Sequence, residues 1–171
     1  MSDSGQRNLG KGMILVGWLC LLGVLTLFFS DRLDQRYNPN QNLSGQQLED
    51  GSRVVELKSS RGGHYVASGS INGVTANFLL DTGATTVSVP EHIARTMGLE
   101  RGAPIMMSTA NGTATAYMTT LDSVRLGNIE LNGVRATINP NTEFDEILLG
   151  MSFLRHLEFT QRGDTLKLRQ Y

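Results

Sequence analysis

The chain has 171 residues, and its 15 Lys and Arg side chains nearly balance its 16 Asp and Glu side chains. This balance excludes the strongly basic surface of a nucleic-acid-binding domain. A single cysteine, Cys20, excludes a disulfide framework and a cysteine-based zinc site. The histidines His64, His92 and His156 lie far apart and form no metal-binding spacing, so we expect no metal and no other cofactor.

An apolar segment without charges, residues 13–30, follows a polar tail of residues 1–12. As a helix it spans about 28 Å, close to the roughly 30 Å of a bilayer's hydrocarbon core. A buried soluble helix would show a polar stripe, which this segment lacks. A cleaved signal peptide would be shorter, about 7–15 apolar residues, and would end in small side chains rather than Phe28 and Phe29. The sequence therefore predicts an uncleaved single-pass transmembrane helix with a cytoplasmic N-terminus and the rest of the chain outside.

Residues 31–60 are rich in Asn, Gln, Ser, Gly and charged side chains. Such a composition buries little apolar surface and predicts a flexible polar linker. Thirty flexible residues would have a root-mean-square reach on the order of 30 Å.

Residues 61–171 alternate short apolar and β-branched runs with turn signals. Asn72-Gly73, Asn111-Gly112 and Asn132-Gly133 predict hairpin turns, and Gly163-Asp164 predicts a closing hairpin. Short helices are expected within residues 90–98 and 151–157. The fold class is therefore all-β, a small closed barrel or sandwich with one or two short helices, preceded by the N-terminal transmembrane helix.

The apolar strand predicted at residues 74–80 ends abruptly in Asp81-Thr82-Gly83. A carboxylate at the end of a buried strand, before a glycine turn, lies where catalytic carboxylates are commonly held. Two later segments echo this region: residues 131–134 repeat the pattern of residues 71–74, and residues 147–150 repeat that of residues 78–81, with Gly150 where Asp81 stands. Asn-Gly turns recur by chance in β proteins, but the paired echo of turn and apolar strand makes chance a weaker explanation.

Residues 79–84 and 147–150 resemble the active-site turn and the apolar-apolar-glycine segment of retropepsin-type aspartic proteases. With residues 63–65, 71–73, 109–112 and 148–154, the chain is similar to a membrane-anchored bacterial family of single-domain retropepsin-like proteases. The resemblance implies an aspartic endopeptidase, a hydrolase, in which Asp81 pairs with Asp81 of a second copy in a homodimer. It also implies an extended peptide or protein substrate and a protease domain, residues 61–171, on the periplasmic side of the bacterial inner membrane.

The resemblance further implies roles for the residues around Asp81. Thr82 would hold the two turns of the dimer together, and the backbone of Gly83 would donate to the carboxylate. Ala84 lacks the hydroxyl that a serine would offer to the charged pair, so we expect activity that extends to mildly acidic or near-neutral pH. The hairpin tip would be a flap over the peptide, formed by Thr109, Ala110, Asn111 and Gly112. Four apolar residues are candidate pocket walls: Val87, Ile105, Met107 and Ile147.

Two other readings remain at this point. A catalytically silent, membrane-tethered peptide-binding or assembly module would use the same fold without needing an ionisable Asp81. A purely structural β-domain is disfavoured because an unpaired carboxylate at the end of an apolar strand is costly. Asp122, Asp145 and Glu146 are interpreted as solvated surface charges rather than as partners of Asp81.

Overall fold

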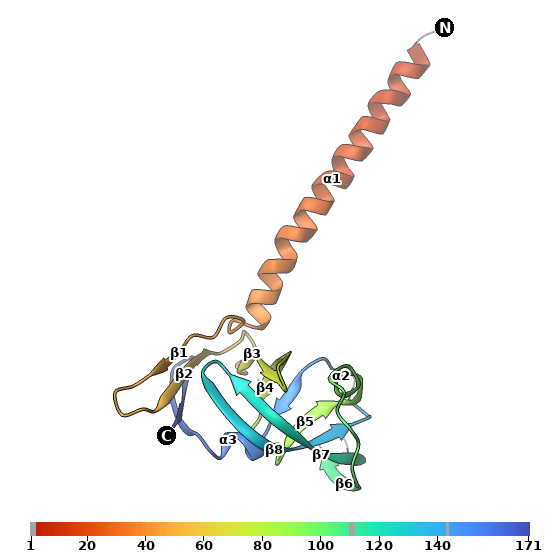
Figure 1. The fold of residues 1–171 in the computed structure, drawn as a ribbon. Coiled ribbons are helices and arrows are strands. Elements are labelled where there is room, and N and C mark those ends of the chain that lie inside the picture. Colours follow the sequence, from red (N-terminus) through yellow and green to blue (C-terminus); the bar gives the residue numbers. More distant parts are fainter. Residues whose placement is uncertain (1–2, 110–111, 143) are drawn as a thin grey trace. The chain divides into compact units, whose positions relative to one another are not determined.

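The computed structural model describes residues 3–109, 112–142 and 144–171, and it divides the chain into two units between Arg36 and Tyr37 (Figure 1). The first unit is helical. The second unit holds all the strands of the described residues, which confirms the predicted all-β class for this part of the chain.

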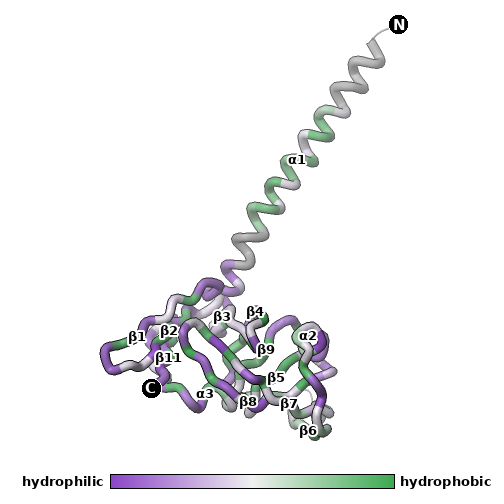
Figure 2. Tube along the Cα trace, in the orientation of Figure 1, coloured by the Kyte–Doolittle hydropathy of each residue, from purple (hydrophilic) through white to green (hydrophobic). Residues whose placement is uncertain are grey.

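The described part of the first unit is the helix α1 (Asp3–Tyr37), whose last residue, Tyr37, belongs to the second unit. Its residues Gly12–Phe29 have a mean hydropathy of 2.4, and Figure 2 shows this apolar stretch along the helix. Eighteen helical residues measure about 27 Å. By length and composition the helix matches the predicted membrane span, as a signal sequence also would.

The larger sheet of the second unit has seven strands in the order β3-β4-β9-β5-β8-β7-β6. Because β3 also pairs with β7, six of these strands close into a barrel, and β6 pairs with β7 alone among the described residues. The strands are β3 (Val66–Ile71), β4 (Val74–Leu80), β5 (Val87–Pro90), β6 (Pro104–Thr109), β7 (Gly112–Leu126), β8 (Ile129–Asn139) and β9 (Ile147–Leu149).

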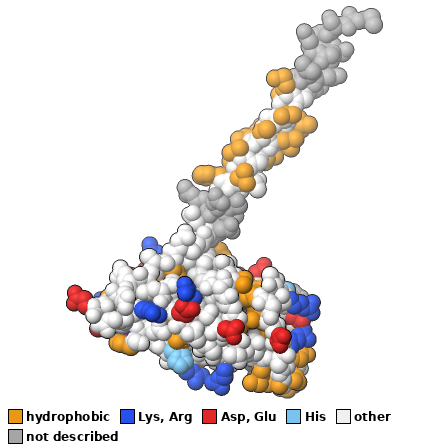
Figure 3. Space-filling view, viewed as in Figure 1, with side chains coloured by type: hydrophobic (Ala, Val, Ile, Leu, Met, Phe, Trp, Pro, Cys, Tyr) orange, Lys and Arg blue, Asp and Glu red, His pale blue; other side chains and the backbone are white. Residues whose placement is uncertain are grey.

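Two helices of one to two turns accompany the barrel, as predicted: α2 (Glu91–Thr96) and α3 (Met151–Leu154). Both helices contribute buried side chains to the core. The largest fully buried side chains are those of Phe78 and Phe153. Figure 3 shows Lys and Arg side chains interspersed with Asp and Glu on one face of the second unit.

The hairpin predicted at Asn72-Gly73 joins β3 to β4. Both turn residues have positive φ angles, 50° and 80°, as a tight two-residue hairpin turn requires. The hairpin at the end of β6 and β7 is also present, with Thr109 opposite Gly112.

The turn predicted at Asn132-Gly133 is wrong, because these residues lie inside β8. The hairpin between β7 and β8 turns instead at Gly127-Asn128, where Gly127 has a φ of 60°. This register pairs Leu126 with Ile129 and buries both side chains completely. Burial of the two apolar residues explains why the chain turns here, since a one-residue slip would move them to the opposite face.

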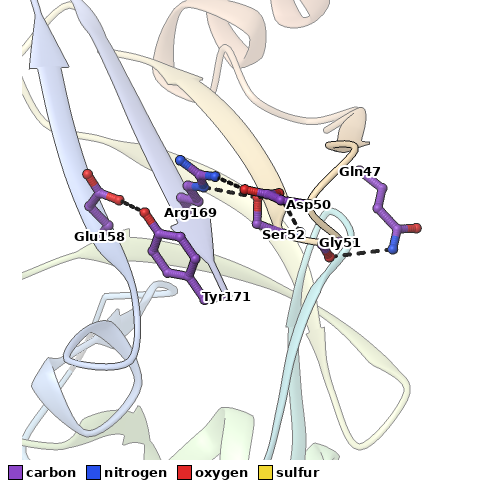
Figure 4. A network of polar contacts seen from close by, with 7 residues as sticks. All are labelled: Gln47, Asp50, Gly51, Ser52, Glu158, Arg169 and Tyr171. Atoms are coloured by element: carbon purple, nitrogen blue, oxygen red, sulfur yellow. Dashed lines mark hydrogen bonds and ion pairs between the residues drawn. The ribbon is translucent and has the colours of Figure 1, made fainter.

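A second, four-stranded sheet has the order β1-β2-β11-β10. Its strands are β1 (Gly45–Gln47), β2 (Arg53–Lys58), β10 (Glu158–Arg162) and β11 (Thr165–Gln170), and β10 and β11 form the predicted closing hairpin. Polar side chains join its N-terminal and C-terminal parts: Arg169 on β11 bonds to Ser52 at 2.9 Å and to Asp50 (Figure 4).

The prediction of a flexible linker over residues 31–60 is therefore wrong. Helix α1 runs through its first part, and β2 pairs with β11 along six residues in the middle of the smaller sheet. Val54, Val55 and Leu57 are buried in the core, so this segment gains enough apolar burial to be ordered. Its polar composition concealed this because the few buried residues of β2 stand among exposed charged ones, Arg53, Glu56 and Lys58.

Candidate active site

Asp81 follows the last residue of β4, next to the short strand β9. The two strands run parallel, with Phe78, Leu79 and Leu80 opposite Ile147, Leu148 and Leu149. The backbone N–H of Asp81 donates to the carbonyl of Leu149 at 3.2 Å, which continues the ladder by one residue. The two echoed segments of the sequence are thus direct neighbours, and Asp81 lies beside Gly150.

The turn after β4 orients the carboxylate of Asp81. The backbone N–H of Gly83 donates to Oδ1 of Asp81 at 2.8 Å, and the N–H of Ala84 donates to the carbonyl of Asp81 at 3.3 Å. Thr82 and Gly83 are exposed, whereas Asp81 and Ala84 are half-buried. A side chain at Gly83 would bring its Cβ to 3.1 Å from Oδ1, so glycine allows the backbone to approach the carboxylate closely.

Gly150 is held tightly against the loop that follows Asp81. A Cβ atom at this position would lie 2.2 Å from the carbonyl oxygen of Thr86 and 2.6 Å from that of Ala84. The N–H of Met151 donates to the same Ala84 carbonyl at 2.8 Å. Close backbone packing therefore explains why the second echo carries glycine, and it leaves no room there for another carboxylate.

Ser152 supports the turn from behind and was not singled out from the sequence. Its hydroxyl is buried, accepts a hydrogen bond from the N–H of Val87 at 2.9 Å and donates to the carbonyl of Arg135 at 2.7 Å. It thereby joins the start of β5, which follows the Asp81 turn, to α3 and β8. A lone serine in a short helix gave no sequence signal for such a bridge.

The predicted flap residues lie at the end of the β6–β7 hairpin. Thr109 and Gly112 form its last pair, and Ala110 and Asn111 lie outside the described residues. On this hairpin Met106 is 72% exposed, whereas Ile105 and Met107 are half-buried. Two of the predicted pocket walls are wrong, because Val87 and Ile147 are fully buried in the core and present no surface to a peptide.

The other carboxylates considered have partners of their own or lie on the surface. Asp145 is 3.0 Å from Nε2 of His92, and Glu146 accepts a hydrogen bond from Tyr37. Asp122 is exposed on β7. Over the described ranges, no group of three His, Cys, Asp or Glu side chains is arranged to hold a metal ion.

Comparisons with known proteins agree with this geometry. The family described as "gag-polyprotein putative aspartyl protease" matches residues 67–156. An uncharacterized protein in the cobV 5′ region of Sinorhizobium sp is 33% identical over 177 residues, which cover 96% of this chain and 76% of that protein.

Among solved structures, a retropepsin-like aspartic protease from Rickettsia conorii is similar with a TM-score of 0.57 and 24% identity, covering 75% of this chain and 95% of that one. The EIAV protease in complex with an inhibitor has a TM-score of 0.43 and 19% identity, covering 53% of this chain and 84% of that one. The match to the Rickettsia protein shows a shared fold.

Proposed function

Because the chain belongs to the gag-polyprotein aspartyl protease family and has a retropepsin-like fold, we propose that it is a membrane-anchored aspartic endopeptidase with Asp81 as its catalytic carboxylate. The observation that carries the proposal is the place of Asp81. It ends an apolar strand, its Oδ1 accepts the N–H of Gly83, and its turn is held against β9.

The proposal requires two copies of the chain. Aspartic proteolysis uses two carboxylates that share one proton, since two like charges so close together do not both ionise. The equivalent turn after β9 carries Gly150, where backbone atoms occupy the space of a side chain. The second carboxylate is therefore Asp81 of a second copy, which a two-fold symmetric homodimer brings to the same place.

In this dimer the ionised Asp81 carboxylate takes a proton from a water molecule as the water oxygen bonds to the scissile carbonyl carbon. The protonated carboxyl group of the other copy gives its proton to the carbonyl oxygen, and a tetrahedral diol results. The carbon–nitrogen bond then breaks as the leaving amine takes the proton from one carboxyl group of the pair, while a hydroxyl group of the diol gives its proton to the other. Hydrolysis of one peptide bond thus yields one new carboxylic acid and one new amine.

The neighbouring residues have supporting roles in this proposal. The backbone N–H of Gly83 orients the carboxylate, and the exposed Thr82 is available to bond with the turn of the second copy. Ala84 holds the β9 corner through its carbonyl, which accepts the N–H of Met151. The hairpin end at residues 109–112 covers an extended peptide, which gains affinity from backbone hydrogen bonds.

The proposed location is the bacterial inner membrane. The polar tail of residues 1–12 lies in the cytoplasm, the apolar part of α1 crosses the bilayer, and the second unit from Tyr37 onward is periplasmic. The apolar length of Gly12–Phe29 supports this arrangement. Anchoring raises the local concentration of the copies that must pair.

The test is cleavage of a peptide library by the full chain in detergent micelles, comparing wild type with Asp81→Asn. Loss of the ionisable group is expected to lower the rate by about 10³-fold or more. Asp122→Asn, which removes an exposed carboxylate from β7, is the matched control and should cleave like wild type. Equal cleavage by Asp81→Asn would refute the role of Asp81, and a wild type that binds peptides but cuts none at any pH would be a peptide-binding module instead.

A further inference from the structure

Two buried asparagines, Asn38 and Asn40, follow α1 directly and belong to the second unit. We call them the asparagine clasp. Their side chains are only 4% and 5% exposed, although the sequence around them is almost entirely polar. Buried amides need hydrogen-bond partners, and these two have them.

Asn40 joins the two sheets. Its Nδ2 donates to the carbonyl of Lys58 on β2 at 2.8 Å and to the carbonyl of Val66 on β3 at 2.7 Å. Its Oδ1 accepts the N–H of Lys58 at 2.8 Å, and its own carbonyl accepts the N–H of Ser68 at 3.1 Å. If Asn40 left this place, these strand groups would lose their partners, so the clasp stays docked in the folded domain.

Asn38 connects the same segment to the strand that carries Asp81. Its Nδ2 donates to Oγ of Ser68 at 2.9 Å and lies 3.3 Å from Oδ1 of Asn77 on β4, and its Oδ1 accepts the N–H of Asn40 at 2.9 Å. Asn77 lies on β4 four residues before Asp81, which directly follows the strand.

The chain between the apolar span and the clasp is short. From Phe29 to Tyr37 the helix α1 accounts for about 12 Å, at 1.5 Å per residue, and Asn38 is the next residue. From Asn77 along β4 to Asp81, the residue after the strand, the chain measures about 13 Å, at 3.3 Å per residue. With the Asn38–Asn77 contact between them, Asp81 can lie no farther than about 35 Å from the end of the span, whatever angle the helix takes.

We propose that the asparagine clasp limits the reach of the protease, so that in proteins held in the same membrane it cuts only segments close to the bilayer. This inference rests on the proposed function and names the substrate class of that site. A limit of about 35 Å corresponds to roughly ten residues of extended chain. A flexible linker of thirty residues would impose no such limit, since it would add its own reach of about 30 Å.

The experiment uses the full chain in liposomes that also contain a single-span substrate protein. Stiff proline-rich spacers of 5, 10, 20 and 30 residues, about 3.1 Å per residue, separate its span from a peptide chosen by the library assay. Wild type is expected to cut the 5- and 10-residue substrates and to cut the 20- and 30-residue substrates at least tenfold more slowly.

Two insertion variants isolate the clasp. A 20-residue Gly-Ser insert between Arg36 and Tyr37 lies before the clasp and adds about 25 Å of reach, so this variant should also cut the 20-residue substrate. The same insert between Gln41 and Asn42 lies after the clasp in an exposed loop, and it should leave the wild-type pattern unchanged.

The outcomes separate the two proposals. Wild type and both insertion variants should cut free peptide in solution equally. If none of the three cuts free peptide, the proposed function itself is refuted. If free peptide is cut but wild type also cuts the 30-residue substrate as fast as the 5-residue one, the reach limit is wrong. If both insertions extend the reach equally, Asn38 and Asn40 do not fix the distance between the apolar span and the protease domain.

Discussion

Replacement of Gly150 by alanine should disrupt the Asp81 turn more than any other single methyl group added to a glycine near it. The new Cβ would lie 2.2 Å from the carbonyl oxygen of Thr86 and 2.6 Å from that of Ala84. Gly150 has a φ of −89°, which any residue adopts, so the cost of Gly150→Ala is steric and does not come from backbone strain.

The size of the effect follows from the atoms involved. An ordinary contact begins at 3.4 Å, so the Thr86 carbonyl and the Gly150 backbone must separate by about 1.2 Å. That shift disturbs the hydrogen bonds of Met151 to Ala84 and of Asp81 to Leu149. Overpacking costs about 1–3 kcal/mol and each weakened backbone bond about 1 kcal/mol, so we expect a loss of about 3–5 kcal/mol in the free energy of unfolding.

The assay is urea unfolding of the full chain in detergent, followed by the near-UV circular dichroism of tyrosine, together with peptide cleavage below the transition. Gly163→Ala in the β10–β11 turn is the matched control. Its Cβ meets nothing within 4 Å, and its φ of 59° predicts a cost of about 1–2 kcal/mol from backbone strain alone, with cleavage unchanged. If the free energy of unfolding of Gly150→Ala lies within 1 kcal/mol of the wild-type value and the variant cleaves peptide normally, the close packing of the two echoed segments does not support the site.

Two further substitutions test other contacts. Ser152→Ala removes the partner of both the Val87 N–H and the Arg135 carbonyl, so we expect a loss of about 2–4 kcal/mol in urea unfolding, and a loss below 1 kcal/mol would contradict the bridge. Hydrogen bonds from Ser52 keep the pKa of Asp50 below its ordinary value of 3.8, so its contribution to stability is present above that pH and disappears as the pH falls further. Asp50→Asn should therefore destabilise the chain at pH 7 and have a smaller effect at pH 3, and an equal effect at both pH values would refute this linkage.

Several features could be predicted from the sequence because they depend on neighbouring residues along the chain. The hairpin at Asn72-Gly73 needs only two residues that accept positive φ. The strand ending at Asp81 shows in its own apolar and β-branched residues, and the apolar span shows in its length and lack of charge. The family resemblance also rested on local motifs, and the match to residues 67–156 confirms it.

Other features depend on partners far away in the sequence. The Asn132-Gly133 dipeptide has the residues of a turn, but burial of Leu126 and Ile129 across the hairpin decides where the chain reverses. Asn38 and Asn40 have the composition of a linker, and their hydrogen-bond partners on β2, β3 and β4 come together only in the folded chain. Hydrogen bonds between distant segments leave no periodic pattern in the residues that make them.

The sequence by itself determined that one apolar strand ends in Asp81 and that a second, similar strand ends in Gly150. Only the tertiary structure decided that the two strands lie side by side and that backbone carbonyls fill the space where a side chain at Gly150 would be. The physical reason is that parallel pairing joins segments some seventy residues apart, so its steric demands appear only once the strands meet.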